Sequence, residues 1–136
     1  MVCFEGVCAV DYLLDSIVLL WYLRRKYDAP KLVRNLRRRK GALFVSSLSV
    51  IEVIRGVDPD EEVRMRKFLK TLAVVPVDGE IAELAATYLR KYWPLGFRID
   101  FIDATIAATA AVKDLTLVTY NPWHYPMPEV KMYALY

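Results

Sequence analysis

The chain has 136 residues, of which 56% are hydrophobic and 26% are charged, and its formal net charge is +3. This length fits one domain spanning residues 1–136, and the composition indicates a globular chain with a generous core. The weak positive charge permits an acidic partner but does not require one. The longest charge-free stretches, 41–51 and 115–128, are shorter than the roughly 20 apolar residues that a membrane helix needs. The start of the chain also lacks the pattern of a secretory signal, so we expect no membrane association and a cytoplasmic location.

Strands alternate with helices along the sequence. The apolar and turn-forming patterns predict strands at 8–15, 42–47, 73–77 and 115–121, a further edge strand at 130–135, and helices at 16–27, 30–40, 49–56, 58–72, 79–93 and 100–112. Each strand is short and apolar on both faces, which is typical of a parallel sheet covered by helices. The sequence therefore predicts the α/β class.

The two cysteines, Cys3 and Cys8, do not form a disulfide framework. They do not indicate a zinc site either, because His124 is the single histidine and lies far along the chain. Two interpretations stay open for them: ordinary small residues near a strand, or a local disulfide.

Basic residues gather in two runs, at 22–27 and 36–40. Such runs could meet phosphate groups. From charge alone, a solvated helix face is the better explanation.

Four polar residues stand where a parallel sheet usually binds ligands, beyond the carboxyl ends of its strands. Asp15 ends the first strand, and Asn121 ends the fourth. Glu52 falls in the first turn of the helix after the second strand, and Asp103 in the first turn of the helix before the fourth. These groups come from distant parts of the sequence, and we expect them to converge on one edge of the sheet.

Each of these residues also has a local explanation. Glu52 follows Ser49 at capping-box spacing, Asp15 could cap the next helix, and Asn121 precedes a proline as turn residues do. Together they favour a metal site, because carboxylates brought close repel one another unless a cation neutralises them. Magnesium binds through few carboxylates and keeps several waters, and such a metal can generate hydroxide for phosphoryl chemistry.

Other chemistries fit the sequence poorly. One histidine excludes a ribonuclease that uses two, and no glycine-rich phosphate loop is present. A phosphatase with an aspartyl nucleophile would need a second Asp two residues after Asp15, where Ile17 stands.

Four segments resemble the PIN-domain ribonucleases of the VapC toxin type, and their order and spacing fit that family over nearly the whole chain. They are LLDSIVLL (13–20), SSLSVIEVIRG (46–56), IDATIAATA (102–110) and LVTYNPWHY (117–125). The resemblance implies a three-layer α/β/α PIN-like fold with a central, mostly parallel sheet. It also implies a metal-dependent endoribonuclease that uses Mg²⁺ or Mn²⁺ to hydrolyse RNA.

Carried over by position, the resemblance makes Asp15 and Asp103 the chief metal ligands and gives Glu52 a share in binding metal or its water. Asn121 stands where many members carry a further acidic residue, which weakens the case for a second metal. Ile17 replaces a small polar residue. His124 and Tyr125 match a pair that we interpret as structural.

The resemblance also separates two neighbouring aspartates. Asp103 aligns with the catalytic position, whereas Asp100 lies three residues earlier, where a helix N-cap is expected. We therefore predict that Asp100 holds the start of the helix and that Asp103 takes part in the metal site.

The resemblance to this family implies partners as well. VapC-type toxins are usually homodimers inhibited by a small antitoxin protein. The apolar segments 17–23 and 50–54 are candidates for these contacts, with plain core packing as the equal alternative. Two other functions remain: a PIN nuclease of RNA processing or decay, and a non-catalytic RNA-binding or scaffold protein on the same fold.

Overall fold

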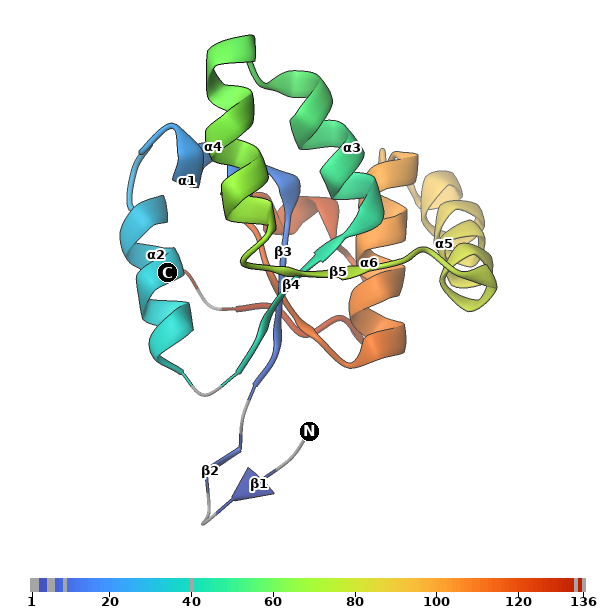
Figure 1. Cartoon of the computed structure of the whole chain (residues 1–136). Coiled ribbons are helices and arrows are strands. Elements are labelled where there is room, and N and C mark those ends of the chain that lie inside the picture. The colour runs from blue at the N-terminus through green and yellow to red at the C-terminus, as the bar shows by residue number, and fades with distance from the viewer. Residues whose placement is uncertain (1–2, 5–6, 9, 40, 134, 136) are drawn as a thin grey trace.

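The computed structural model describes residues 3–4, 7–8, 10–39, 41–133 and 135, and a four-stranded parallel sheet lies at its centre (Figure 1). The strands follow the spatial order β5-β4-β3-β6, so β3 pairs with both β4 and β6. Their bounds are β3 (Tyr12–Leu14), β4 (Leu43–Ser46), β5 (Ala73–Val75) and β6 (Thr116–Val118). The predicted parallel sheet is confirmed.

Helices cover both faces of this sheet, which gives three layers (Figure 1). One layer contains α1 (Ser16–Leu23), α2 (Ala29–Arg38), α3 (Ser47–Gly56) and α4 (Pro59–Leu69). The other contains α5 (Gly79–Tyr92) and α6 (Phe101–Lys113), and short 3₁₀ turns follow at η1 (Trp93–Leu95) and η2 (Pro122–His124). Among the residues described, no helix has both the length and the apolarity needed to cross a bilayer.

The strands divide their side chains between two cores because successive residues of a strand point to opposite faces. Tyr12 and Leu14 pack among α1 to α4, whereas Leu13 packs against α5 and α6. In α6 the side chains of 104–110 are all buried, and four of these seven residues are alanines. Small side chains let this helix lie close to the sheet, so its first turn is held firmly at the sheet edge.

All the predicted strands are longer than the observed ones, and the first and last predictions differ most from the structure. The first was predicted over 8–15, but β2 (Val7–Cys8) pairs antiparallel with β1 (Cys3–Phe4) outside the central sheet. The side chains of both cysteines lie outside the described part of the structure. The edge strand predicted at 130–135 is wrong: it is a single bridge between Met132 and Leu117.

The first helix also ends earlier than the predicted 16–27. It stops at Leu23, and Arg25 and Tyr27 then adopt left-handed backbone conformations, each with φ of 53°. This turn folds the Tyr27 ring back onto Trp21, with 4.6 Å between the ring centroids. The polar sequence after Leu23 thus forms a tight connection to α2 rather than another helical turn.

Gly41 is required by a close backbone approach. We predicted that it ends the second helix, but α2 already ends at Arg38. A Cβ atom at position 41 would overlap the carbonyl of Val10, just before β3. The absence of a side chain therefore lets the loop before β4 pack against the entry to β3, where Ala42 N–H donates to Asp11 Oδ1 at 2.8 Å.

Candidate acidic active site

The order of the strands reverses at β3, and this reversal creates the candidate site. The chain proceeds from β3 to β4 and β5 on one side and then returns to place β6 on the other. Asp15 directly follows β3 and Thr119 directly follows β6. Their side chains meet, because Thr119 Oγ1 donates to Asp15 Oδ2 at 2.7 Å. Open parallel sheets bind their ligands at such a reversal.

Asp15 is a buried carboxylate, with only 7% of its surface exposed. Its Oδ1 accepts the Ser16 N–H at 2.7 Å, so Asp15 caps α1 as its local sequence predicted. Its Oδ2 accepts hydrogen bonds from Thr119 and from the Tyr125 hydroxyl at 3.1 Å. Burial raises the pKa of Asp15, the three hydrogen bonds oppose this rise, and the nearby charge of Glu52 adds to it.

The two aspartates at the start of α6 have different surroundings, as predicted. Asp100 is the N-cap, and its Oδ1 accepts the Asp103 N–H at 2.8 Å. The Asp103 carboxylate turns toward the sheet edge, with Oδ2 3.1 Å from Nδ1 of His124. The pKa of Asp103 is raised to about 6, mainly by burial and also by the charges of Asp100 and Asp15, while His124 opposes the rise.

The Tyr125 hydroxyl joins the two acids. It lies 3.1 Å from Asp15 Oδ2 and 3.4 Å from Asp103 Oδ1, and the ring is buried. Burial and the two adjacent carboxylates raise the pKa of Tyr125, so the hydroxyl keeps its proton and can donate it to either acid. Sequence reasoning gave Tyr125 a structural role and did not identify Thr119. Both residues hold Asp15 in place.

Glu52 lies farther along its helix than predicted. The helix begins at Ser47, and its N-cap is Ser46, whose Oγ accepts the Leu48 N–H at 3.2 Å. The capping-box interpretation of Ser49 and Glu52 is therefore wrong, because Ser49 is buried inside the helix. Glu52 is partly exposed, and it lies near enough to Asp15 for its charge to raise the pKa of that carboxyl.

Asn121 does not end its strand, because β6 stops at Val118. Its backbone N–H donates to Thr119 Oγ1 at 3.0 Å, and its carbonyl accepts the His124 N–H at 3.0 Å. Asn121 thus starts the η2 turn that carries His124 and Tyr125 to the acids. It also lines a separate cavity with aromatic walls.

The donor set fits magnesium better than zinc. In the part of the chain that the structure describes, no three His, Cys, Asp or Glu side chains gather closely enough to chelate an ion. Asp15 and Asp103 form a carboxylate pair instead, joined through Tyr125. Mg²⁺ is usually bound through one or two carboxylates and keeps several waters, whereas zinc sites use three or four protein ligands. Two desolvated acids side by side also favour a cation electrostatically.

The raised pKa of Asp103 predicts how the stability of the metal-free protein depends on pH. The ordinary pKa is 3.8 and the folded value is about 6, so between these values the folded chain binds more protons at Asp103 than the unfolded chain does. Its contribution to the free energy of unfolding is full below pH 3.8 and is lost as the pH rises through about 6.

Urea unfolding of the wild type and of Asp103→Asn, both in chelator from pH 4 to 7, measures this contribution. The wild type should lose stability relative to the variant as the pH rises. A difference that stays constant over this range would contradict the raised pKa.

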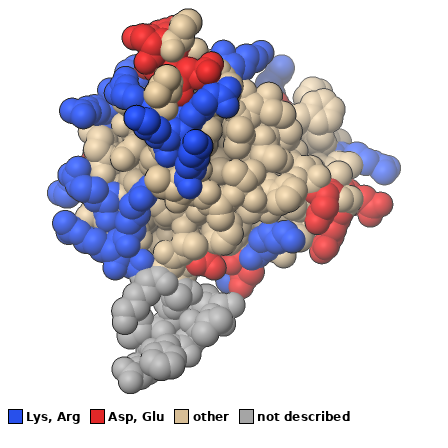
Figure 2. Space-filling model, viewed as in Figure 1, with Lys and Arg blue, Asp and Glu red and all other residues tan. Residues whose placement is uncertain are grey.

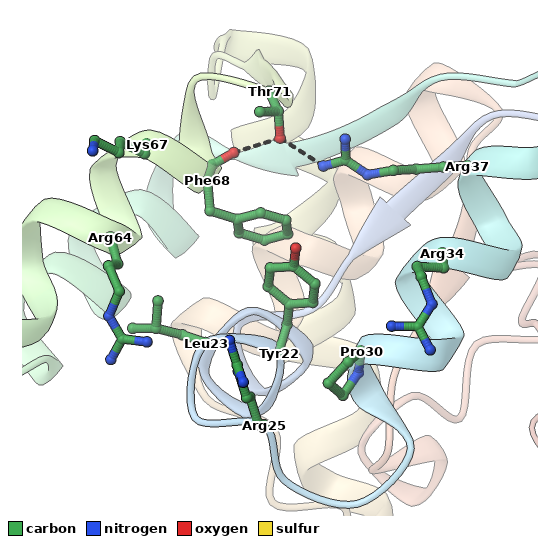
Figure 3. Close-up of a pocket in the computed structure, with 10 residues that line it drawn as sticks. All are labelled: Tyr22, Leu23, Arg25, Pro30, Arg34, Arg37, Arg64, Lys67, Phe68 and Thr71. Atoms are coloured by element: carbon green, nitrogen blue, oxygen red, sulfur yellow. Dashed lines mark hydrogen bonds between the residues drawn. The ribbon is translucent and has the colours of Figure 1, made fainter.

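A basic groove lies apart from the acids, between α1, α2 and α4. Figure 2 shows Lys and Arg side chains gathered over this side of the molecule. The groove encloses about 700 Å³, and the stacked rings of Tyr22 and Phe68, 4.1 Å apart, form its floor (Figure 3). In the described part of the chain, no acidic residue lines this groove. Its lining includes five cations, namely Arg25, Arg34, Arg37, Arg64 and Lys67.

The chain is similar to known proteins in sequence and in fold. The chain is 38% identical to Ribonuclease VapC10 of Mycobacterium tuberculosis over 117 residues, which are 86% of this chain and 87% of that protein. It is 30% identical to Ribonuclease VapC19 of the same organism over 115 residues, or 85% and 92% of the two chains. The fold resembles that of VapBC2 from Rickettsia felis, solved with a DNA fragment from their promoter, with a TM-score of 0.80, 18% identity and coverage of 91% and 98%.

The model of the PIN domain matches residues 12–124, a segment that contains the central sheet, both aspartates of the site and His124. The match and the relatives agree with the three-layer fold and with the resemblance noted in four segments of the sequence. The chain therefore belongs to the PIN domain family, with VapC ribonucleases among its relatives.

Proposed function

We propose that this chain is a metal-dependent endoribonuclease that hydrolyses RNA phosphodiester bonds, and that it is the toxin of a VapBC-type toxin–antitoxin pair acting in the cytoplasm. The observation that carries the proposal is a pair of carboxylates, the buried Asp15 and the partly buried Asp103, joined through the Tyr125 hydroxyl at the strand-order reversal. The ribonucleases named VapC10 and VapC19 support it as relatives.

Asp15 and Asp103 would hold Mg²⁺ or Mn²⁺, and Glu52 would help to bind the metal or its water. Such an ion supplies an activated water and neutralises charge on the reacting phosphate. Thr119, the Ser16 N–H and the Tyr125 hydroxyl fix the Asp15 carboxylate, so it needs little reorganisation. Glu52 is partly exposed and lies near Asp15. We assign it the role of the general base that accepts a proton from the attacking water. We assign Asn121 a positioning role in the loop 119–125, where its backbone N–H donates to Thr119 and where it starts the η2 turn.

Cleavage of a labelled single-stranded RNA tests this function. With Mg²⁺ or Mn²⁺ the RNA should be cut internally, and excess EDTA should abolish the cutting until metal is restored. A parallel preparation of Asp103→Asn controls for contaminating nucleases. Cleavage that persists in EDTA would sink the metal mechanism, and intact RNA under every metal condition would favour the non-catalytic alternative.

A small antitoxin protein is the partner that we propose, and the basic groove is its docking site. The R. felis relative in fold was solved as a VapBC pair, which supports a partner of this kind. Five cations around an aromatic floor complement an acidic segment that carries an apolar side chain. Much of the candidate segment 17–23 is core, since Val18, Leu19 and Leu23 are buried, although Tyr22 reaches the groove.

We also propose that the chain forms a homodimer. Large apolar side chains are exposed near the junction of α5 and α6, namely Trp93, Leu95, Phe97 and Phe101, and another, Ile51, is exposed on α3. Surfaces of this kind are typical of protein interfaces. Light scattering at micromolar concentration should give twice the 15.7 kDa mass of one chain. A mass of 15.7 kDa that does not change with concentration would refute the dimer.

A further inference from the structure

A second cavity shares the loop 119–125 with the acidic site, and its walls are largely aromatic. It encloses about 510 Å³, within the usual range for small-ligand sites. The end of α1, the turn before α2 and the loop 119–125 surround it. We call it the aromatic cavity, and its lining residues are Trp21, Tyr27, Asp28, Tyr120, Asn121, Trp123 and Leu135.

Two of the four aromatic side chains of this cavity are largely exposed. The Trp21 ring lies 4.6 Å from that of Tyr27 and 4.5 Å from that of Tyr120, at tilts of 44° and 40°. Tyr27 nevertheless remains 79% exposed, and Trp123 is 68% exposed. Exposed aromatic rings that converge on one cavity are a sign of a binding surface.

The backbone beside Tyr27 supports the same interpretation. Arg25 and Tyr27 both have φ of 53°, a conformation that costs free energy in residues other than glycine. This turn holds the Tyr27 ring against Trp21 while most of the ring remains in water. Core packing therefore does not account for the position of Tyr27, whereas a ligand that covers the ring would.

The charge of the lining favours a neutral flat group over a phosphate. Among the residues that the structure describes, no Lys or Arg lines the aromatic cavity. The charged member of its lining is Asp28, whose Oδ1 accepts the Tyr120 hydroxyl at 2.7 Å. A phosphate would meet this carboxylate without a compensating cation. A nucleobase is neutral, stacks on aromatic rings and can hydrogen-bond to a carboxylate or an amide, as Asp28 and Asn121 offer.

One loop connects the aromatic cavity to the acids. Thr119 and His124 contact Asp15 and Asp103, whereas Tyr120 and Trp123 line the aromatic cavity. Helix α1 sets the distance between the aromatic cavity and the acids. Trp21 follows Asp15 by six residues, or about 9 Å along a helix axis. A base next to the phosphate held at the acids could reach across this distance.

We propose that the aromatic cavity takes one unstacked base of single-stranded RNA, from a nucleotide flanking the phosphodiester bond that is cut. This inference rests on the proposed ribonuclease function and adds a specificity-determining site to it. Stacking of a base on aromatic side chains gives substantial affinity with little dependence on base identity. The basic groove, by contrast, has the cations that the aromatic cavity lacks.

Binding of short RNAs tests the aromatic cavity without requiring cleavage. The protein is Asp103→Asn in Mg²⁺, and the probes are a hexanucleotide and six versions of it, each with a different nucleotide made abasic. One abasic position should weaken binding by roughly tenfold. Adding Trp123→Ala should weaken binding of the intact RNA by a similar factor and remove the effect of that abasic position. Adding Trp123→Phe instead should preserve most of the affinity for intact RNA and most of the effect of the abasic position.

Val74→Ala is the control, because Val74 is an apolar side chain of β5 that is 48% exposed and lies outside the aromatic cavity. It should leave the abasic pattern unchanged. Thermal melts check that each variant folds, and Tyr27→Ala repeats the test at a second, more exposed ring.

Equal binding of all seven RNAs would overturn the proposal. So would an equal loss for intact and abasic RNA in Trp123→Ala, because that loss would not depend on the base. Loss of antitoxin binding with RNA binding unchanged would assign the cavity to a protein side chain instead. If the abasic effect holds but wild-type protein cuts no RNA with metal, the proposed function fails and the base site stands.

Discussion

Replacing Asp103 by Asn should lower RNA cleavage by roughly 10³-fold or more while the protein stays folded. Asn has nearly the same shape as Asp but lacks the charge that a cation needs at this position. Burial and the charges of Asp100 and Asp15 disfavour the ionised carboxylate in the metal-free protein. The variant should therefore unfold at the same temperature as the wild type near pH 7, or at a higher one. Cleavage rates and thermal melts measured on the same preparations check both parts.

Asp100 provides the matched control, because it lies next to the same helical turn and its side chain caps the helix by accepting the Asp103 N–H. Asp100→Asn should be nearly silent, since Asn caps helices about as well as Asp. Asp100→Ala should cost about 1 kcal/mol of stability and spare most of the activity. If Asp100→Asn abolished cleavage and Asp103→Asn did not, the two assignments would be reversed.

Asp15→Ala should lower RNA cleavage at least as much as Asp103→Asn does. Unlike Asp103→Asn, it should also destabilise the folded protein. Its carboxylate accepts three hydrogen bonds, from the Ser16 N–H, Thr119 and Tyr125. Alanine leaves these donors without their acceptor at a buried position, and each such loss costs about 1–3 kcal/mol. Relief of the buried charge offsets part of this cost, so we expect a net loss of about 2 kcal/mol.

Asp15→Asn should be inactive but closer to the wild type in stability, because its amide oxygen can still cap α1. Asp78→Ala is the matched control: Asp78 caps α5 by accepting the Ile81 N–H at 3.0 Å, far along the chain from the acids. It should cost about 1 kcal/mol and leave cleavage unchanged. Urea unfolding and RNA cleavage would be measured for the wild type and for these three variants. Wild-type stability of Asp15→Ala would show that the hydroxyls find other acceptors.

The parts of the fold and site that depend on local sequence could be predicted. Short apolar strands between helices predicted the parallel sheet, and Asp15 fell at the end of a strand because the apolar run stops there. Asp100 could be recognised as a cap from its spacing to Asp103. The start of α3 was misplaced because Ser46 and Ser49 are both good capping residues, and local sequence alone does not choose between them.

The contacts that depend on distant residues were missed. The Thr119 hydroxyl reaches a carboxylate 104 residues earlier in the chain, and the Tyr125 hydroxyl reaches the same group across 110 residues. These contacts exist because β6 pairs with β3 and because η2 turns the chain back toward the sheet. No periodicity or capping rule contains this information. The pairing of residues 7–8 with 3–4, which lies outside the central sheet, was also missed, although it joins residues close together in the sequence.

The insertion of β6 beside β3 has a consequence for the order of events during synthesis. Asp15 is made early, but Thr119, His124 and Tyr125 leave the ribosome more than a hundred residues later. Chains grow at roughly 5–20 residues per second, so several seconds separate the first acid from the groups that hold it. Until β6 docks, Asp15 has neither Thr119 nor Tyr125 as a partner. The site is thus completed only after β6 and η2 have been made, so a chain still on the ribosome at residue 100 lacks the groups that hold Asp15 in place.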